Sequence, residues 1–456
     1  MGIKWRSSTW YITTVVTYGA WTEAFVYMVG VPIIPFRLED LGFTHFSTRS
    51  SWFLFSYCIA ISIYTLPNAI FLDKRSWRRS PMIVATCAMQ LSLLLLILVK
   101  QYWAMVLTRI IQGLSCTVIW SVGFALICEN VDQKVVGRQL GIAFTGSHLG
   151  NVVGPAAGSG LYSAFGWKGP WILCMGVCSI ELIARWLVIE KNTIVIHQSG
   201  EQTKHVKKQD GYTTTPIAAP SPISEMTDSQ ANEHRLVKEK SNQLSPFQVV
   251  IGLFSIPRSL TAISVNFGTG LVIGAIDPTL TLRLKDQWGK DSHFVGLVYL
   301  ATIAPVLLTG VITGHLADKF GAEWIVPTTS LLAAPFCLLM ILQNSLLGFI
   351  MSFGLMNFFI NCALAPIGVE VSAVTRDNDG ISELHQFAAL NLAWAAPMAI
   401  GTVIGGQLYD RIGWTSVCWF CFACCLITVP ATLAYTGDRP LLRRFLKRNS
   451  ISRTTT

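Results

Sequence analysis

The sequence predicts an all-α integral membrane protein, with twelve transmembrane helices in two pseudo-symmetric six-helix bundles. Three observations carry this prediction: the composition, the number of long apolar runs, and an internal repeat. Hydrophobic residues make up 52% of the 456 residues and charged residues 13%, about half the charged share of a typical soluble domain. The mean hydropathy of +0.50 is too high for a surface in water. The net charge of +9 does not indicate nucleic-acid binding, because the basic residues lie in short loops between apolar runs.

The apolar runs are long enough to cross a bilayer, which takes about 20 residues for each helix. Twelve such runs are present, six before a long polar segment and six after it. They cover residues 12–34, 50–72, 81–99, 103–128, 139–165, 170–189, 258–280, 294–316, 325–343, 346–372, 385–409 and 415–436. No cleavable signal peptide is expected, because the first run is too long for one and no small-residue cleavage site follows it.

The distribution of lysine and arginine predicts the orientation in the membrane. With a cytoplasmic N-terminus, the cytoplasmic loops and tails carry 23 basic residues and the opposite side carries 8. Because basic residues concentrate on the cytoplasmic side, both termini are expected inside. The plasma membrane is the expected location, with a vacuolar or vesicular membrane as the alternative.

The polar segment between the two groups of runs differs in kind from the rest of the chain. Residues 191–246 are rich in Ser, Thr, Gln, Lys and Glu and nearly free of aromatic residues. Such a segment cannot bury enough apolar surface to offset its ordering entropy. We therefore expect an N-terminal bundle at 1–190, a disordered cytoplasmic linker at 191–246, a C-terminal bundle at 247–438 and a basic cytoplasmic tail at 439–456.

All twelve cysteines fall inside apolar runs, and four of them crowd the last one at positions 418, 421, 424 and 425. The spacing includes Cys-x-x-Cys, but zinc ligands are normally polar, accessible and often accompanied by histidine. We interpret these cysteines as small apolar residues. Neither a metal site, a cofactor nor a disulfide framework is expected.

The two halves of the chain are repeats of each other. Residues of the first run recur 246 positions later, an aspartate after the second run recurs 245 later, and a glycine-rich pattern of the fifth run recurs 247 later. The matched pairs are Pro32 and Pro278, Arg37 and Arg283, Leu38 and Leu284, Asp40 and Asp286, Asp73 and Asp318, Gly154 and Gly401, Gly158 and Gly405, Leu161 and Leu408, Tyr162 and Tyr409, Gly166 and Gly413, and Trp167 and Trp414. Parallel repeats of this kind can rock about a midplane site, as alternating-access transporters do.

Two loops carry an acidic residue followed by basic ones. The second copy, Gly314–Gly321, reads Gly-His-Leu-Ala-Asp-Lys-Phe-Gly, and the first, Ala69–Arg79, lacks both glycines. With these loops the chain resembles the major facilitator superfamily over essentially its full length. The resemblance implies gating by pairing across the halves at the cytoplasmic side, with Asp73, Arg78, Asp318 and Lys319 as the gating residues. Ordinary positive-inside residues with a helix N-terminal acid are the alternative.

An arginine inside the fourth run matches a second pattern of the superfamily, Arg109-Ile-Ile-Gln-Gly113. A buried arginine in a membrane helix costs at least roughly 2.5–3.5 kcal/mol. Arg109 should therefore face a cavity or an acidic partner, where it would tune a proton-coupling carboxylate. A static ion pair between two helices is the alternative.

The fifth run carries glycine at every fourth position, which makes a flat face for close helix approach. Gly150, Gly154, Pro155 and Gly158 form Gly-x-x-x-Gly-Pro-x-x-Gly, and Ser159 stands where a further glycine is usual. This pattern is similar to the signature of proton-coupled drug antiporters within the superfamily, which implies export. Tight packing alone is the alternative reading, and packing is also how the motif would act.

A carboxylate in the first run narrows the resemblance. Glu23 lies nine residues before Pro32 in Val31-Pro-Ile-Ile-Pro35, which looks like the vesicular amine transporter branch. Glu23 would be the proton-coupling carboxylate or the contact for a cationic solute, or else a glutamate satisfied by neighbouring hydroxyls. That branch has an acid in the eleventh helix, where this chain has Asn391, so amine selectivity and coupling stoichiometry stay open.

Other polar residues inside the runs are secondary candidates. Glu181 and Arg185, one turn apart, are interpreted as a self-neutralising surface pair near the inner interface. Asp277 and Glu370 are expected too near helix ends to be buried. The remaining candidates are His148, Asn266, Asn357 and Asn361, together with Tyr27, Phe358 and Trp394, which line an aromatic cavity or face lipid.

The expected function is a proton-coupled secondary transporter that exports a small organic solute, such as a drug, toxin, secondary metabolite or amine. Its partners are that solute, protons and the lipid bilayer, without nucleic acid, and it is expected to work as a monomer. An uptake permease is the rival within transport, and a membrane receptor or enzyme is the rival from another class. No enzyme is expected, because the sequence has no Walker loop and no His-Glu-x-x-His motif.

Overall fold

The computed structural model describes residues 6, 8–73, 78–131, 133–188, 252, 256–342, 345–364, 366–367, 383–437 and 440–442. Its regular secondary structure is helical throughout this part of the chain. Three predictions lie outside it: the linker 191–246, Glu370, and the tail 439–456 apart from residues 440–442. The side chains of Asp73 and Asp318 are also outside it.

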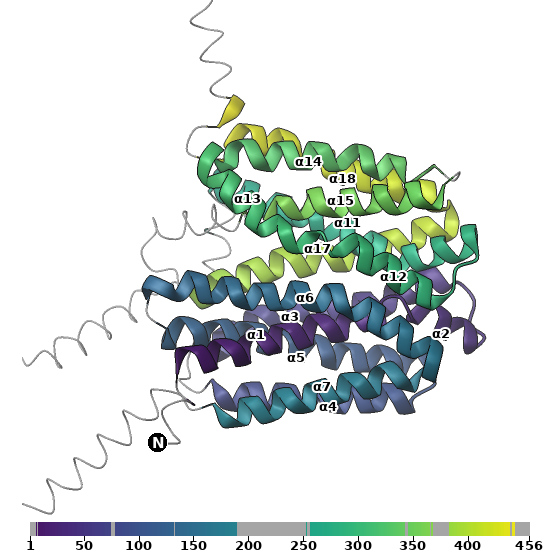
Figure 1. The fold of residues 1–456 in the computed structure, drawn as a ribbon, viewed down its shortest axis with the longest axis horizontal. Coiled ribbons are helices and arrows are strands. Elements are labelled where there is room, and N and C mark those ends of the chain that lie inside the picture. The colour runs from purple at the N-terminus through teal and green to yellow at the C-terminus, as the bar shows by residue number, and fades with distance from the viewer. Residues whose placement is uncertain are drawn as a thin grey trace, which may run out of the picture.

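The helices form two bundles that lie one above the other in Figure 1, each continuous in sequence. The N-terminal bundle contains α1 (Thr9–Gly30), α2 (Ile34–Asp40), α3 (Phe46–Asp73), α4 (Arg79–Leu98), α5 (Tyr102–Asn130), α6 (Gln133–Phe165) and α7 (Lys168–Leu187). The C-terminal bundle contains α11 (Pro257–Trp288), α12 (Ser292–Ile303), α13 (Val306–Phe320), α14 (Ala322–Leu339), α15 (Leu346–Cys362), α17 (Glu383–Arg411) and α18 (Trp414–Tyr435).

The described helices match the twelve predicted apolar runs, six in each bundle, when α1 is counted with α2 and α12 with α13. Eight helical stretches in the described chain are long and apolar enough to cross a membrane, with α12 and α13 counted as one. The bent pair α1 and α2, 42° apart, makes a ninth. α15 is apolar but shorter, and α6 and α17 are long helices that carry the glycine-rich repeat.

Local signals set the helix ends. The side chains of Ser8, Asp291 and Ser345 accept hydrogen bonds from backbone N–H groups three residues later and so cap α1, α12 and α15. Gly289, at φ 60°, ends α11 in the left-handed conformation that glycine adopts at low cost. Local residues therefore fix three helix starts and one helix end.

Contacts repeat between the two bundles as the sequence repeat predicts. In each bundle an arginine lies over a tryptophan ring, the indole N–H of that tryptophan donates to a backbone carbonyl, and a tyrosine donates to an aspartate. The N-terminal set is Arg37 over Trp167 at 4.9 Å, Trp167 to Leu96 at 3.1 Å, and Tyr162 to Asp40. The C-terminal set is Arg283 over Trp414 at 5.9 Å, Trp414 to Met340 at 2.9 Å, and Tyr409 to Asp286 at 2.7 Å.

The bundles meet along two helix pairs, α6 with α12 and α3 with α17. At the first pair, a Cβ on Gly296 would lie 2.7 Å from the Pro155 carbonyl oxygen and 2.6 Å from the Ser159 Cβ. At the second, a Cβ on Gly406 would lie 2.7 Å from the Ser51 Cβ. Ser159 and Gly406 are repeat partners, and so are Gly296 and Ser51, so each crossing pairs one serine with one glycine. This explains the serine at position 159, where the motif usually has glycine.

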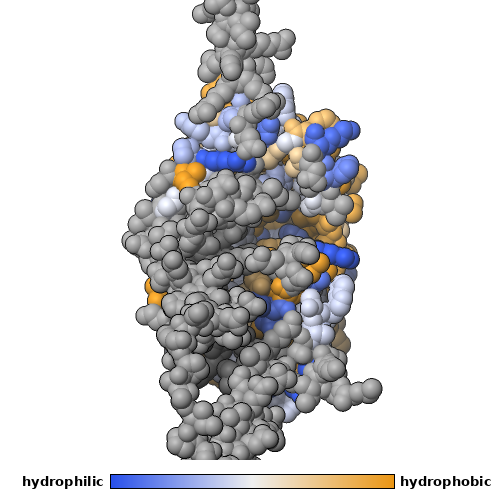
Figure 2. All heavy atoms as spheres, turned by 90° about the vertical axis from the view of Figure 1, so that its left-hand side faces the viewer, coloured by the Kyte–Doolittle hydropathy of each residue, from blue (hydrophilic) through white to orange (hydrophobic). Residues whose placement is uncertain are grey.

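One end of the interface is closed by polar contacts. We call it the α2 end, because α2 and the Gly289–Asp291 turn lie there, opposite the N-terminus (Figure 1). Lys285 forms an ion pair with Glu39, Thr48 donates to Asp410 through its hydroxyl at 2.5 Å, and Ser47 donates to the Gly406 carbonyl at 3.1 Å. Figure 2 shows the other end, where hydrophilic residues lie among the described atoms and hydrophobic ones follow one flank. The two bundles are therefore held together at the α2 end.

Candidate functional site

A buried carboxylate from α1 lies in the interior of the N-terminal bundle. Glu23 is 2% exposed, and its Oε1 accepts a hydrogen bond of 2.8 Å from the Tyr57 hydroxyl of α3. Its Oε2 has no hydrogen-bond partner among the described residues. Because an unpaired buried acceptor is costly, Glu23 is suited to hold a proton or to receive a donor from a ligand.

A second carboxylate faces this group from the other bundle. Asp277 of α11 is buried, and its Oδ2 accepts a hydrogen bond of 3.0 Å from the Tyr27 hydroxyl of α1. The Tyr299 hydroxyl lies 3.4 Å from the Asp277 backbone carbonyl oxygen. The expectation that Asp277 sits too near a helix end to be buried was wrong. Pro278 lies inside α11, which continues to Trp288, so the aspartate is well within the helix.

Two tyrosine rings join the carboxylates into one network. The rings of Tyr27 and Tyr57 lie 4.9 Å apart at an interplanar angle of 31°, within the range of favourable aromatic contacts. Each ring sends its hydroxyl to a different carboxylate, Tyr57 to Glu23 and Tyr27 to Asp277. We call Glu23, Tyr57, Tyr27 and Asp277 the interbundle network. Tyr27 is thus an interior residue rather than a lipid-facing one, whereas Phe358 lies in a separate groove of the C-terminal bundle.

Arg109 of α5 is fully buried and lies near this network. Its Nη1 donates to Gln112 Oε1 at 2.7 Å, and its guanidinium lies 4.5 Å from the Phe53 ring centroid and 5.6 Å from that of Trp171. The expected acidic partner is not in ion-pair contact, and Nε and Nη2 have no hydrogen-bond partner in the described chain. Aromatic faces and an amide stabilise the charge instead.

Glu181 and Arg185 of α7 contradict the interpretation of a surface pair. They are 1% and 2% exposed, and Arg185 donates through Nε to Glu181 Oε1 at 2.7 Å and pairs with it through Nη2. The pair lies against Gly19 of α1, whose missing side chain leaves room for the guanidinium. The i, i+4 spacing was compatible with either location, and the glycine on the facing helix decided it.

The glycine motif of α6 packs against the helix that carries Glu23. A Cβ on Gly150 would lie 2.5 Å from the Trp21 carbonyl oxygen, one on Gly154 3.0 Å from the Phe25 carbonyl oxygen, and one on Gly158 2.6 Å from the Val29 carbonyl oxygen. These approaches leave no space for a side chain, so the motif holds α1 directly on α6. Pro155 lies on the adjacent surface of α6, toward Gly296 of α12. The motif therefore supports the network by positioning α1.

The predicted gating residues lie at the end opposite α2. Arg78 forms an ion pair with Glu129 at the end of α5, with Nη2 and Oε1 2.6 Å apart, inside the N-terminal bundle. Lys319 is exposed, with its ammonium 5.2 Å from the Phe320 ring centroid. Asn391 of α17 is half-buried.

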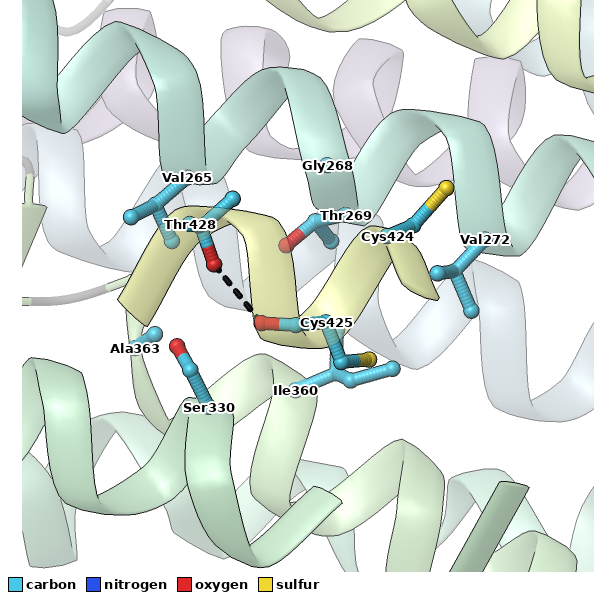
Figure 3. A pocket seen from close by; sticks show the side chains of 10 residues that line it. All are labelled: Val265, Gly268, Thr269, Val272, Ser330, Ile360, Ala363, Cys424, Cys425 and Thr428. Carbon is cyan, nitrogen blue, oxygen red and sulfur yellow. Dashed lines mark hydrogen bonds between the residues drawn. The ribbon is translucent and has the colours of Figure 1, made fainter. Parts of the chain in front are cut away.

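Figure 3 shows a small cavity in the C-terminal bundle, lined by residues of α11, α14, α15 and α18. Its lining includes the hydroxyl-bearing Thr269, Ser330 and Thr428, and the Thr428 hydroxyl donates to the Cys425 carbonyl at 2.9 Å. By the repeat offsets Thr269 corresponds to Glu23 and Thr428 to Glu181. The volume of about 20 Å³ has room for roughly one water molecule. The buried Glu181–Arg185 pair therefore has no charged counterpart at the corresponding positions of the C-terminal bundle.

The sequence matches the Major Facilitator Superfamily over residues 16–268 and 262–454. It is 24% identical to the MFS-type transporter ppzB of Metarhizium rileyi, over 90% of this chain and 92% of that protein. It is 22% identical to the multidrug resistance protein MdtG of Klebsiella pneumoniae, over 79% of this chain and 76% of that protein. The fold is similar to that of a D-xylose–proton symporter, with a TM-score of 0.69, 12% identity, and coverage of 94% of this chain and 98% of the other. The chain belongs to the Major Facilitator Superfamily of membrane transporters.

Proposed function

We propose that the protein is a proton-coupled secondary transporter that exports a small organic solute by alternating access. Glu23 is the coupling carboxylate in this proposal, and the two bundles rock about the interbundle network. The basic residues of the loops favour an orientation with both termini in the cytoplasm. The α2 end would then face outward, and the contacts that close it would belong to an inward-facing state.

The observation that carries the proposal is the position of Glu23. It is a buried carboxylate with one oxygen bound by Tyr57 and the other without a partner among the described residues. It is joined through two tyrosines in ring contact to a carboxylate of the opposite bundle. A carboxylate in this position can exchange a proton for a group of the solute. Protonation and solute binding would both change the charge at the interface along which the bundles move.

Export is favoured over uptake by the glycine–proline motif at Gly150–Gly158 and by the name of the bacterial relative MdtG, a multidrug resistance protein. The symporter's structural likeness bears on the fold alone, because its identity to this chain is 12%. The proposed substrate is an organic solute of the drug, toxin, secondary metabolite or amine type, and the plasma membrane is the proposed location.

The test is proton flux in liposomes. Purified protein is reconstituted with a pH-sensitive dye inside, an inside-acidic gradient is imposed, and a panel of lipophilic cations and neutral compounds is added. We expect at least one compound to dissipate the gradient with the wild-type protein and to lose that effect with Glu23→Gln.

Asp291→Asn is the matched control, because Asp291 is an exposed helix cap and asparagine caps about as well as aspartate. This variant should retain the wild-type flux. Flux that survives Glu23→Gln would remove that residue from the coupling path. If no compound of the panel changes the gradient with the wild-type protein, proton antiport of these solute classes is refuted.

A further inference from the structure

We propose that Asp277 is a second ion-coupling carboxylate, which in its ionised form holds Tyr27 of the opposite bundle and keeps the α2 end closed until one positive charge binds. This inference rests on the proposed function and assigns a role to a residue that the sequence analysis expected near a helix end. It concerns the condition under which the carrier is allowed to change conformation.

The first argument is the geometry of the contact. Tyr27 and Asp277 come from α1 and α11, belong to different bundles, and are each 5% exposed. The other side-chain contacts that close the α2 end include exposed groups, such as Lys285 with Glu39 and Thr48 with Asp410. Exposed ion pairs contribute little, whereas a hydrogen bond to an ionised group is about twice as strong as a neutral one. Asp277 therefore makes the buried charged contact between the bundles.

The second argument is the charge balance. Among the described buried residues around the network, Arg109 contributes one positive charge and the carboxyl groups of Glu23 and Asp277 contribute two negative charges. Glu181 and Arg185 neutralise each other. With every group ionised, the site has one negative charge in excess in a region of low dielectric constant, which is costly. One proton or one monovalent cationic group restores neutrality.

The third argument is that the site can accommodate such a charge. Glu23 Oε2 is an acceptor without a partner among the described residues. The rings of Tyr27 and Tyr57 lie between the two carboxylates, and Tyr299 contacts Asp277 from α12. Aromatic faces attract cations. A protonated or quaternary nitrogen of the solute would therefore compete with a proton to neutralise the excess negative charge of the site.

These arguments together supply a rule for coupling. An empty site leaves Asp277 ionised, so the bond to Tyr27 is strong and the bundles stay closed at the α2 end. Protonation or a bound cationic group neutralises the carboxylate, which weakens that bond and allows the α2 end to open. Only the loaded carrier then switches, and loaded switching is what prevents a proton leak.

Several titratable groups surround Asp277 and must be separated from it. Tyr27 faces it from α1, Tyr299 from α12 and Cys58 from α3. Other acidic and basic side chains lie at the α2 end, and all of them are retained in the Asp277 and Tyr27 variants below. They include Arg37, Glu39, Asp40, His45, Arg49, Arg283, Lys285, Asp286, Lys290, Asp291, His293, Asp410 and Arg411.

The first experiment measures coupling in the liposome assay with Asp277→Asn and Tyr27→Phe. Asp277→Asn is permanently neutral, so exchange of labelled for unlabelled solute should persist while gradient-driven flux falls at least about tenfold and its pH dependence flattens. Tyr27→Phe keeps the carboxylate, so the pH dependence of solute binding should persist while solute-independent proton leak rises. Asp291→Asn is the matched control, because it neutralises an exposed carboxylate at the cap of α12 that lies outside the interbundle network. It should behave as wild type.

The second experiment needs no substrate. Hydrogen–deuterium exchange of residues 36–48 is measured in nanodiscs at pH 5 and pH 8, with labelling times scaled for the intrinsic rates. The wild-type protein should exchange faster at pH 5 by about tenfold, the effect of losing one charge-assisted bond. Asp277→Asn should exchange fast at both pH values.

The outcomes separate the two proposals. Equal exchange in wild type and Asp277→Asn at both pH values, or wild-type coupling in Asp277→Asn, would overturn the role of Asp277 while leaving Glu23 and proton antiport in place. A wild-type protein that moves no protons would overturn the proposed function, and the exchange comparison would still decide whether Asp277 holds the α2 end closed.

Discussion

Replacing Glu181 by leucine would leave the guanidinium of Arg185 in the interior of the N-terminal bundle without its carboxylate partner. The two side chains are 1% and 2% exposed, so solvent screens the pair very little. Arg185 Nη1 already has no hydrogen-bond partner among the described residues, and the Glu181 oxygen is the acceptor for Nε. Removal of one member of a buried ion pair costs about 3–5 kcal/mol. We expect Glu181→Leu to lower the free energy of unfolding by that amount.

The double variant Glu181→Leu with Arg185→Met supplies the decisive comparison. It removes both charges and replaces them with apolar side chains, a change that is often neutral or stabilising by about 1–4 kcal/mol. The repeat supports this expectation, because the C-terminal bundle has the uncharged Thr428 and Thr432 at the corresponding positions. The double variant should therefore be more stable than either single variant.

The assay is unfolding of the purified protein in detergent, followed by tryptophan fluorescence, for the wild type, both single variants and the double variant. The four free energies give the coupling between the two residues directly. A Glu181→Leu variant within 1 kcal/mol of wild type would refute the reasoning. So would a double variant destabilised by the sum of the single effects, since that result would mean that the pair does not interact.

Two further predictions concern the closed α2 end. Gly296→Ala would place a Cβ 2.7 Å from the Pro155 carbonyl oxygen. The resulting overpacking, about 1–3 kcal/mol, should push α6 and α12 apart and speed hydrogen exchange at residues 36–48, whereas Gly310→Ala, which meets no atom within 4 Å, should not. Lys285→Glu should speed the same exchange by no more than about fivefold, because exposed pairs are worth at most about 1 kcal/mol. Adding Glu39→Lys should restore the wild-type rate, and 1 M salt should abolish the difference; a large salt-resistant effect would contradict this account.

The repeat was visible in the sequence, and its structural consequences followed from it. Arg37 and Arg283 are 246 positions apart, and Trp167 and Trp414 are 247 positions apart. The same arginine–tryptophan contact is made in each bundle, by Arg37 with Trp167 and by Arg283 with Trp414. Twelve apolar runs and a glycine face on the fifth likewise predicted two bundles and a close contact between α6 and another helix. Glu23 could be selected because a carboxylate inside an apolar run is costly unless it has a function.

The partners of these residues could not be predicted from the sequence. Tyr27 and Asp277 are 250 positions apart, and only the approach of the two bundles brings them together. Asp277 was misplaced because the apolar run ends at residue 280, whereas α11 continues to Trp288. Arg109 was expected to face a cavity or an acidic partner, and its side chain contacts Gln112, Phe53 and Trp171.

The sequence by itself determined the membrane class, the number of spans, the duplication and the positions of the costly buried charges, because each depends on local composition or on a fixed offset. The tertiary structure decided which of those charges meet. In a soluble helix an apolar stripe marks the buried face, but in a membrane helix the faces toward lipid and toward protein are both apolar. The direction of Glu181 or Asp277 therefore cannot be read from its neighbours in the chain, and it becomes known only when the facing helix, with Gly19 or Tyr27, is in place.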